Sequence, residues 1–140
     1  MAPDDGDTVG DDDVVHRRVL NRPGQMVDYD ENKQRWLPLA AALRFDPDLS
    51  VSLESRLLAR GLSADDVAAS KSGAVAFGCT VATMRAIQLG VTYTPVTPPT
   101  SGLDECHGSV WVDDQWDRDE FKSRRNRLRV ALAQTGGPLL

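Results

Sequence analysis

Short apolar runs alternate with polar segments along this chain, which is the pattern of a domain that combines strands with helices. Residues 14–20 (VVHRRVL) have the period of a strand, although neither face of it is purely apolar. We therefore expect this strand at the edge of a sheet. Turn-forming residues at 21–24 end it, and residues 28–33 are polar enough to predict a loop.

The next segment favours helices. The apolar run at 36–45 (WLPLAAALRF) predicts a helix that carries Pro38 in its first turn, where proline is tolerated. Residues 49–52 predict a short strand or the start of a helix. Two short helices are expected next, over residues 53–60 and 63–70, and the second begins with a serine followed three residues later by an acid, which is a capping pattern.

A compact apolar run at 74–79 (AVAFGC) predicts a buried strand, and Thr80 can cap the helix that follows it. A second strand is predicted at 91–94. A strand, a helix and a strand with short joints imply two parallel or neighbouring strands joined by a right-handed crossover.

The remaining segments complete the prediction. Residues 97–106 form a loop rich in proline, threonine and serine, 108–112 predict another strand, and 117–134 predict a long amphipathic helix. The fold class that follows is α+β: one domain over residues 14–140, with a small mixed sheet of about four or five strands and three or four helices.

Charge is unevenly distributed along the 140 residues. The formal net charge is −5, but six aspartates lie within residues 1–13, so residues 14–140 are left at +1. This acidic segment has no apolar periodicity and too little apolar surface to offset the entropy lost on ordering. The sequence therefore predicts a disordered acidic tail over residues 1–13 that is dispensable for folding.

Several classes of protein are disfavoured by simple counts. No apolar run approaches the ~20 residues of a membrane-spanning helix, and the N-terminus lacks a basic and apolar leader. Two cysteines without CxxC spacing do not make a disulfide framework. We expect a cytoplasmic protein without membrane contact. Glycine-rich phosphate loops and metal-binding motifs are absent from the sequence, so no cofactor is expected.

Cysteine and histidine supply the ligand types of a zinc site, but their spacing argues against one. Cys106 and His107 are adjacent, and neighbours on a strand point to opposite faces. Cys79 is expected in the core at the end of a strand, whereas Cys106 lies in a loop and is the candidate reactive thiol. We predict no metal site.

The C-terminal helix carries the leading functional hypothesis. Four basic residues fall at helical spacing and form one stripe: Arg118, Lys122, Arg125 and Arg129. An apolar stripe led by Phe121 lies beside it and should dock the helix on the core. The stripe is either a solvated face or a partner-binding face. We favour a non-catalytic binding or accessory protein that contacts a protein or another anionic partner through this helix and the loop 97–107. Nucleic acid is not favoured, because the body is nearly neutral.

The alternative hypothesis is an enzyme centred on His107, which lies between a loop and a strand. His107 and His16 could act as general acid and base on a phosphodiester or a nucleotide. An arginine such as Arg85, Arg17 or Arg18 would stabilise the developing charge. This hypothesis requires the two histidines and an arginine to line one pocket. If they do not converge, both histidines are ordinary strand residues.

Four short segments resemble sequences of a group of small actinobacterial proteins: HRRV at 16–19, LSV at 49–51, MRAIQLGV at 84–91 and HGSV at 107–110. The resemblance implies no assigned activity. It indicates which segments matter without saying why, and it leaves the oligomeric state open.

Overall fold

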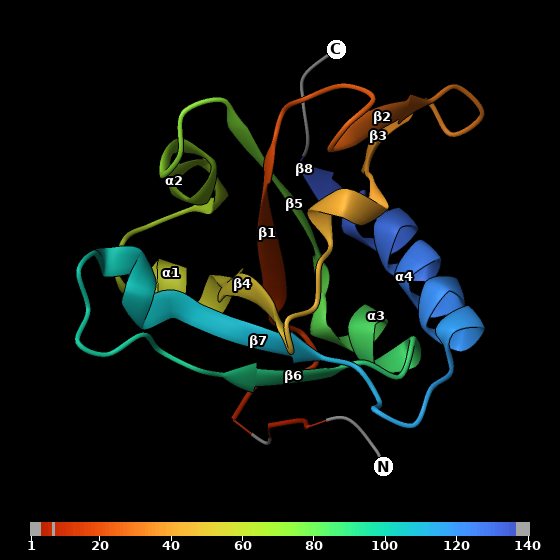
Figure 1. Cartoon of the computed structure of the whole chain (residues 1–140). Coiled ribbons are helices and arrows are strands. Elements are labelled where there is room, and N and C mark those ends of the chain that lie inside the picture. Colours follow the sequence, from red (N-terminus) through yellow and green to blue (C-terminus); the bar gives the residue numbers. More distant parts are fainter. Residues whose placement is uncertain (1–3, 7, 137–140) are drawn as a thin grey trace.

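A bent antiparallel sheet organises the chain in the computed structural model, which describes residues 4–6 and 8–136 (Figure 1). Its strands lie in the order β6-β7-β4-β1-β5-β8, and each pairing between neighbours is antiparallel. Their bounds are β1 Val14–Leu20, β4 Leu49–Leu53, β5 Ala74–Thr80, β6 Gly90–Tyr93, β7 His107–Trp111 and β8 Thr135–Gly136. A separate hairpin consists of β2 Val27–Asp30 and β3 Arg35–Pro38.

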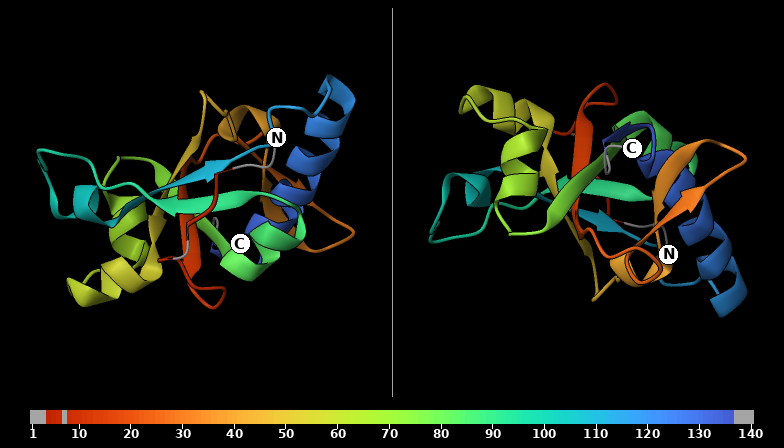
Figure 2. Two further views of the ribbon diagram at one scale, coloured as in Figure 1. Left: turned by 90° about the horizontal axis from the view of Figure 1, so that it is seen from below. Right: turned by 90° about the horizontal axis from the view of Figure 1, so that it is seen from above.

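Helices cover both faces of this sheet (Figure 2). The four α-helices are α1 Glu54–Ala59, α2 Ala64–Ala69, α3 Val81–Ala86 and α4 Arg118–Leu132, and two 3-10 helices are η1 Ala40–Ala42 and η2 Gly102–Cys106. The first two α-helices and η2 lie on one side of β1 and β5, whereas α3 and α4 lie on the other. The structure is therefore an α+β domain, as predicted.

The two faces bury apolar clusters of different size. The larger cluster lies between the sheet, α3 and α4, and its most deeply buried members include Val15, Leu49, Phe77, Val91, Leu128 and Leu132. The smaller cluster lies under α1, α2 and η2 and consists of Leu57, Val67, Ala76 and Cys106. Because the smaller face buries less apolar surface, it leaves room for polar side chains next to the strands.

The sheet divides where β1 meets β4. All seven residues of β1 pair with β5, but only Val15 and His16 pair with β4, opposite Leu53 and Ser52. Beyond these two pairs the strands separate, and β1 runs across the direction of β4, β7 and β6 (Figure 1). We call this opening the fork. The expected edge position for residues 14–20 is wrong, because β1 lies in the interior of the sheet and is polar where it borders the fork.

Two other expectations from the sequence are wrong. Residues 36–45 do not form a helix: Arg35–Pro38 is β3, paired with Val27–Asp30 in the stretch expected to be a loop, and only Ala40–Ala42 has helical turns. Pro38 explains the strand, because its fixed φ also suits the end of an extended segment. The predicted crossover fails as well, because β5 and β6 lie apart in the sheet with β1, β4 and β7 between them.

The predicted helices at 53–60, 63–70 and 117–134 are confirmed, with shorter bounds. The capping pattern is present, since the Ser63 backbone N–H donates to Asp66 at 2.8 Å. Asp117 caps α4 by accepting from the Glu120 N–H at 2.8 Å. Phe121 is only half-buried and meets Phe45 edge to face, with ring centroids 5.8 Å apart. The buried residues of α4 are Leu128, Ala131 and Leu132, so they anchor the helix instead.

The described residues before β1 form a packed strap, which we define as residues 4–6 and 8–13. Val9 is 2% exposed and belongs to the larger core. Asp13 accepts from the Ser55 N–H at 2.9 Å and from its hydroxyl at 2.6 Å, at the start of α1, which has no cap of its own. The Gly6 N–H donates to Val91 O on β6. The described residues of this segment thus make specific contacts with the domain, and the expected disorder of residues 1–13 stays a prediction; residues 1–3 and 7 lie outside the described chain.

Candidate functional site

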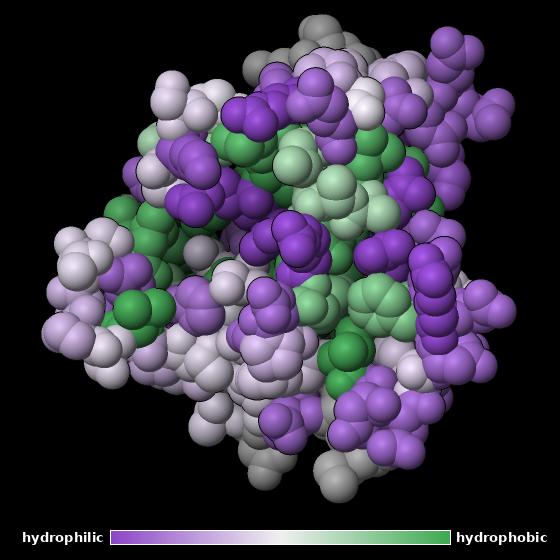
Figure 3. All heavy atoms as spheres, in the orientation of Figure 1, coloured by the Kyte–Doolittle hydropathy of each residue, from purple (hydrophilic) through white to green (hydrophobic). Residues whose placement is uncertain are grey.

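A cleft of ≈ 370 Å³ occupies the fork between β1 and β4. We call it the fork cleft and define it by residues 16–20 of β1 and 50–52 of β4. The end of α2, the start of β7 and residues near η1 close its other sides. In the space-filling view, strongly hydrophilic residues gather over β1 in the middle of this face and hydrophobic residues border them (Figure 3).

One row of residues crosses the sheet beside the cleft. His16 of β1 is paired with Gly78 of β5 on one side and with Ser52 of β4 on the other, and Ser52 is paired in turn with His107 of β7. Residues in register share a face, so both imidazoles lie on the face covered by α1 and α2. With strands about 4.8 Å apart, the two histidine backbones are separated by roughly 10 Å.

The backbone of Arg18 opens into the cleft. The Asn21 N–H donates to Gly73 O at 2.8 Å, in register with the β1–β5 ladder. Hydrogen-bonded pairs alternate along an antiparallel ladder, so the N–H and C=O of Arg18 point away from β5 and toward β4. The ladder with β4 has already ended at His16. The fork therefore presents backbone donors and acceptors as well as side chains.

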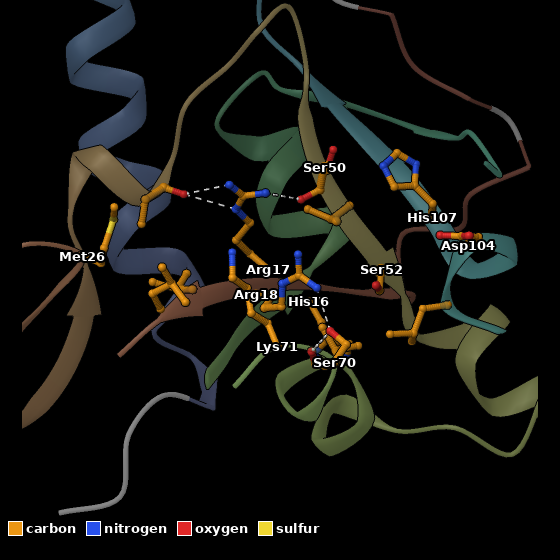
Figure 4. A pocket seen from close by; sticks show the side chains of 16 residues that line it. His16, Arg17, Arg18, Met26, Ser50, Ser52, Ser70, Lys71, Asp104 and His107 are labelled. Atoms are coloured by element: carbon orange, nitrogen blue, oxygen red, sulfur yellow. Dashed lines mark hydrogen bonds between the residues drawn. The ribbon is translucent and has the colours of Figure 1, made fainter. Parts of the chain in front are cut away.

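Arg17 bridges the fork. Its Nε and Nη2 donate to Ala42 O at 3.2 and 3.1 Å, and its Nη1 donates to Ser50 O at 2.8 Å. The guanidinium thus ties β1 to η1 and to β4 where the strands themselves no longer pair (Figure 4). Burial lowers the pKa of Arg17, and the nearby charge of Arg18 lowers it further.

Arg18 and Lys71 add two cations to the same cleft. Arg18 is exposed and donates from Nη1 to the Ser70 hydroxyl at 2.8 Å. Lys71, the residue after Ser70, is also exposed. Among the described residues, neither Arg17 nor Arg18 has a carboxylate partner, although the chain has a net charge of −5. Two close guanidinium groups without a counter-ion repel each other, and a bound anion would relieve that repulsion.

The cleft holds one carboxylate, and it is already engaged. Asp104 accepts hydrogen bonds from the Thr100 N–H and hydroxyl at 2.7 and 2.8 Å and from the Ser101 N–H at 3.2 Å. These bonds, led by the Thr100 N–H, lower the pKa of Asp104. The carboxylate therefore stays ionised, and these hydrogen bonds hold it at the turn before η2. Arg17, Arg18 and Lys71 leave the fork cleft positive.

His107 has a defined tautomer when it is neutral. Its Nδ1 lies 2.7 Å from Thr94 O, and because a carbonyl oxygen only accepts, Nδ1 carries the hydrogen. The Thr94 hydroxyl, 3.1 Å from the same nitrogen, also contacts the Ser109 hydroxyl at 2.6 Å. No described residue bonds the Nε2 of His107. The free nitrogen of this half-buried ring is thus left for a ligand in the fork cleft.

His16 is held differently. It is 5% exposed, and its Nε2 lies 3.3 Å from a carboxylate oxygen of Glu54. A Cβ at residue 78 would come within 2.9 Å of its Nδ1, so only glycine at that position leaves room for the ring. The fold brings His16, His107 and two arginines to one cleft, as the enzyme hypothesis requires. The His16 imidazole itself is enclosed and bound by Glu54.

Arg85 does not line the fork cleft; it binds the strap. Its guanidinium donates to both carboxylate oxygens of Asp5 and to Asp11 at 2.6 Å, and also to the carbonyls of Gly6 and Val9. The hydrogen bond with Asp11, supported by Asp5, raises the pKa of Arg85. The structure gives Arg85 a structural contact where the sequence suggested a catalytic one.

The basic stripe of α4 is divided between structural and exposed residues. Arg129 donates from Nε to Pro38 O at 2.8 Å and so ties α4 to β3. Arg125 lies over the Phe121 ring, 5.1 Å from its centroid, and its buried Nε has no partner in the described chain. Arg118 and Lys122 are exposed. Two of the four residues in the predicted partner-binding stripe are therefore engaged within the protein.

Both cysteine thiols are shielded by burial. Cys79 and Cys106 are free and buried, and burial raises the pKa of the Cys79 thiol to about 12 and also raises that of Cys106. The described residues contain no group of three histidine, cysteine or acidic side chains that could hold a metal ion. Within the same part of the chain, no helix is both long and apolar enough to cross a membrane.

Comparison of the chain with protein-family models, with curated proteins and with solved structures finds no match. The resemblance to actinobacterial proteins therefore stays an expectation. Lys71, Ser50 and Ser52 were not singled out from the sequence. Pairing between β1 and β4 brings the serines to the cleft, and sequence alone does not reveal that pairing.

Proposed function

We propose that this protein binds a small phosphorylated ligand in the fork cleft and acts as a non-catalytic binding protein. The observation that carries the proposal is the pair Arg17 and Arg18, which face the same cleft without a carboxylate partner in the described chain. Phosphate oxygens match guanidinium donors in charge and geometry. The hydroxyl groups of serines in the lining add further donors.

Size and charge also support a small anion. A cleft of ≈ 370 Å³ is at the lower end of the range for small-molecule sites. A phosphate monoester carries about −1.5 to −2 charges at pH 7, which matches three cations and one engaged carboxylate. Free cysteines at positions 79 and 106 suit a reducing compartment, so we place the ligand and the protein in the cytoplasm.

Binding of inorganic phosphate tests this function, with sodium chloride added to hold the ionic strength constant. Phosphate is expected to raise the melting temperature of the wild type, because a ligand that binds only the folded state stabilises it. The double variant Arg18→Gln and Lys71→Gln should bind phosphate at least tenfold more weakly by calorimetry, because it loses two of the three cations.

The matched control removes the same charge from α4. Arg118→Gln with Lys122→Gln leaves the fork cleft intact and should bind phosphate as the wild type does. If this control loses binding while the cleft variant keeps it, the basic stripe of α4 is the anion-binding surface and the proposal is wrong. Equal losses of phosphate affinity in both variants would show that binding follows total charge and not the fork cleft, which would also contradict the proposal. An absence of phosphate binding to the wild type would also refute the proposal.

The hydrogen bond from His107 Nδ1 to Thr94 O favours a second candidate function, cleavage of a phosphodiester. It leaves Nε2 free to accept or donate a proton at the reacting phosphate. Under this alternative, the wild type should hydrolyse bis(4-nitrophenyl) phosphate, and His107→Gln should abolish turnover while phosphate binding persists. Absence of turnover by the wild type would exclude this reaction for the tested diester and favour a non-catalytic role.

A further inference from the structure

The fork cleft is asymmetric along its length. Met26 lies at one end and His107 at the other, with Arg17 between them (Figure 4). The contacts give the same order: Arg17 reaches Ala42 O at one side and Ser50 O at the other, and Ser52, two residues farther along β4, is paired with His107. An anion held by the two arginines would therefore lie between two ends of the cleft that differ in chemistry.

The end near η1 is apolar. It is lined by Val19, which is 4% exposed, by Ala42, which is 6% exposed, and by the half-buried side chains of Leu20 and Met26. The Met26 carbonyl is already used by the Leu39 N–H at 2.8 Å. Polar substituents of a ligand would lose hydrogen bonds to water here without replacement, whereas an apolar group would gain from leaving water.

The opposite end is polar, and because the Asp104 carboxylate lies there beside His107, the phosphate is placed on the side of His107 that faces the arginines. Ser52 and His107 are cross-strand neighbours, and the free Nε2 of His107 can exchange a hydrogen bond with a phosphate oxygen. A phosphate between Arg18 and His107 would contact the two arginines and the imidazole. Its ester oxygen would then direct the rest of the ligand toward Met26.

We infer that the natural ligand is a phosphate monoester whose organic part is a compact apolar group, such as an aromatic ring or a short branched chain. The inference rests on the proposed function and adds to it the nature of the organic part. Met26 is the positioning residue for specificity, because its unbranched thioether adapts to apolar groups of different shape and contacts aromatic rings favourably.

Three probes that differ in their organic part test this inference. Inorganic phosphate has none, glycerol 3-phosphate has a polar one and phenyl phosphate has an aromatic ring. We expect phenyl phosphate to bind the wild type about tenfold more tightly than glycerol 3-phosphate, because burial of the ring is favourable only in the apolar end. Met26→Ser should abolish that difference and leave the affinity for inorganic phosphate unchanged. Met26→Leu should preserve the difference.

A matched control is Val96→Ser, which removes an apolar side chain of the surface that is 41% exposed and lies outside the fork cleft. It should leave all three affinities unchanged. If the three probes bind the wild type with equal affinity, or if glycerol 3-phosphate binds best, the inference is wrong while the phosphate site stands. If none of them binds, the proposed function fails with it. A preference for phenyl phosphate that survives Met26→Ser would place the ring elsewhere and overturn the assignment.

Discussion

Removal of residues 1–13 is expected to lower the free energy of unfolding by about 3–4 kcal/mol. The shortened chain, which begins at Val14, loses a buried valine and the residue that caps α1. Val9 is 2% exposed within the larger core. Asp13 satisfies the Ser55 N–H at the start of α1. Truncation would also leave the Arg85 guanidinium without the carboxylates and carbonyls that now surround it.

Urea unfolding followed by circular dichroism measures this loss, and single variants separate its causes. Val9→Ala should account for about 1–2 kcal/mol, because it removes two methyl groups from the core. Asp12→Asn is the matched control for charge, since Asp12 is exposed and makes no ion pair among the described contacts. A truncated chain as stable as the full one would show that the strap is dispensable, as the sequence had suggested.

The strap also makes contacts that its composition does not reveal. A segment rich in aspartate and glycine has little apolar surface of its own, but the larger core, Arg85 of α3 and Val91 of β6 all contact it. Gly90 contributes as well, because a Cβ at this position would overlap the carbonyl of Asp4. None of these partners is near the segment in sequence. Local reasoning therefore underestimates a segment whose stability comes from long-range contacts.

Local signals predicted α2 and α4 well for the opposite reason. The capping box of Ser63 and Asp66 and the cap of Asp117 act within three residues, so the sequence contains both partners of each interaction. Strand pairing depends on residues far apart in the chain. The position of β1 between β4 and β5 could not be derived from residues 14–20 alone, and the polar residues that suggested an edge instead border the fork.

The candidate site was predicted in part. His107, His16, Arg17 and Arg18 were considered together as chemistry on a phosphate, and the structure does bring them to one cleft. Arg85, proposed for the same role, lies with the strap instead. The difference follows from topology: His16 and His107 are joined through Ser52 across three strands, whereas Arg85 belongs to α3 on the other side of the sheet.

Arg17 carries the other large effect on stability. Arg17→Met is expected to lower the free energy of unfolding by about 3 kcal/mol, because hydrogen bonds from a charged donor to two carbonyls are lost at the point where β1 and β4 no longer pair. Urea unfolding should show the loss as a lower midpoint with an unchanged slope, since the surface exposed on unfolding stays the same.

Two further substitutions show whether geometry or charge is responsible. Arg17→Lys keeps the charge, but a single ammonium cannot reproduce the planar group that reaches both Ala42 O and Ser50 O, so we expect it to lose about 1–2 kcal/mol. Arg18→Gln should cost no stability without a ligand, because it removes the like charge that lowers the pKa of Arg17. The same substitution should weaken phosphate binding. If Arg17→Met proves as stable as the wild type, the strands alone hold the fork open and the three hydrogen bonds of Arg17 add nothing measurable to stability.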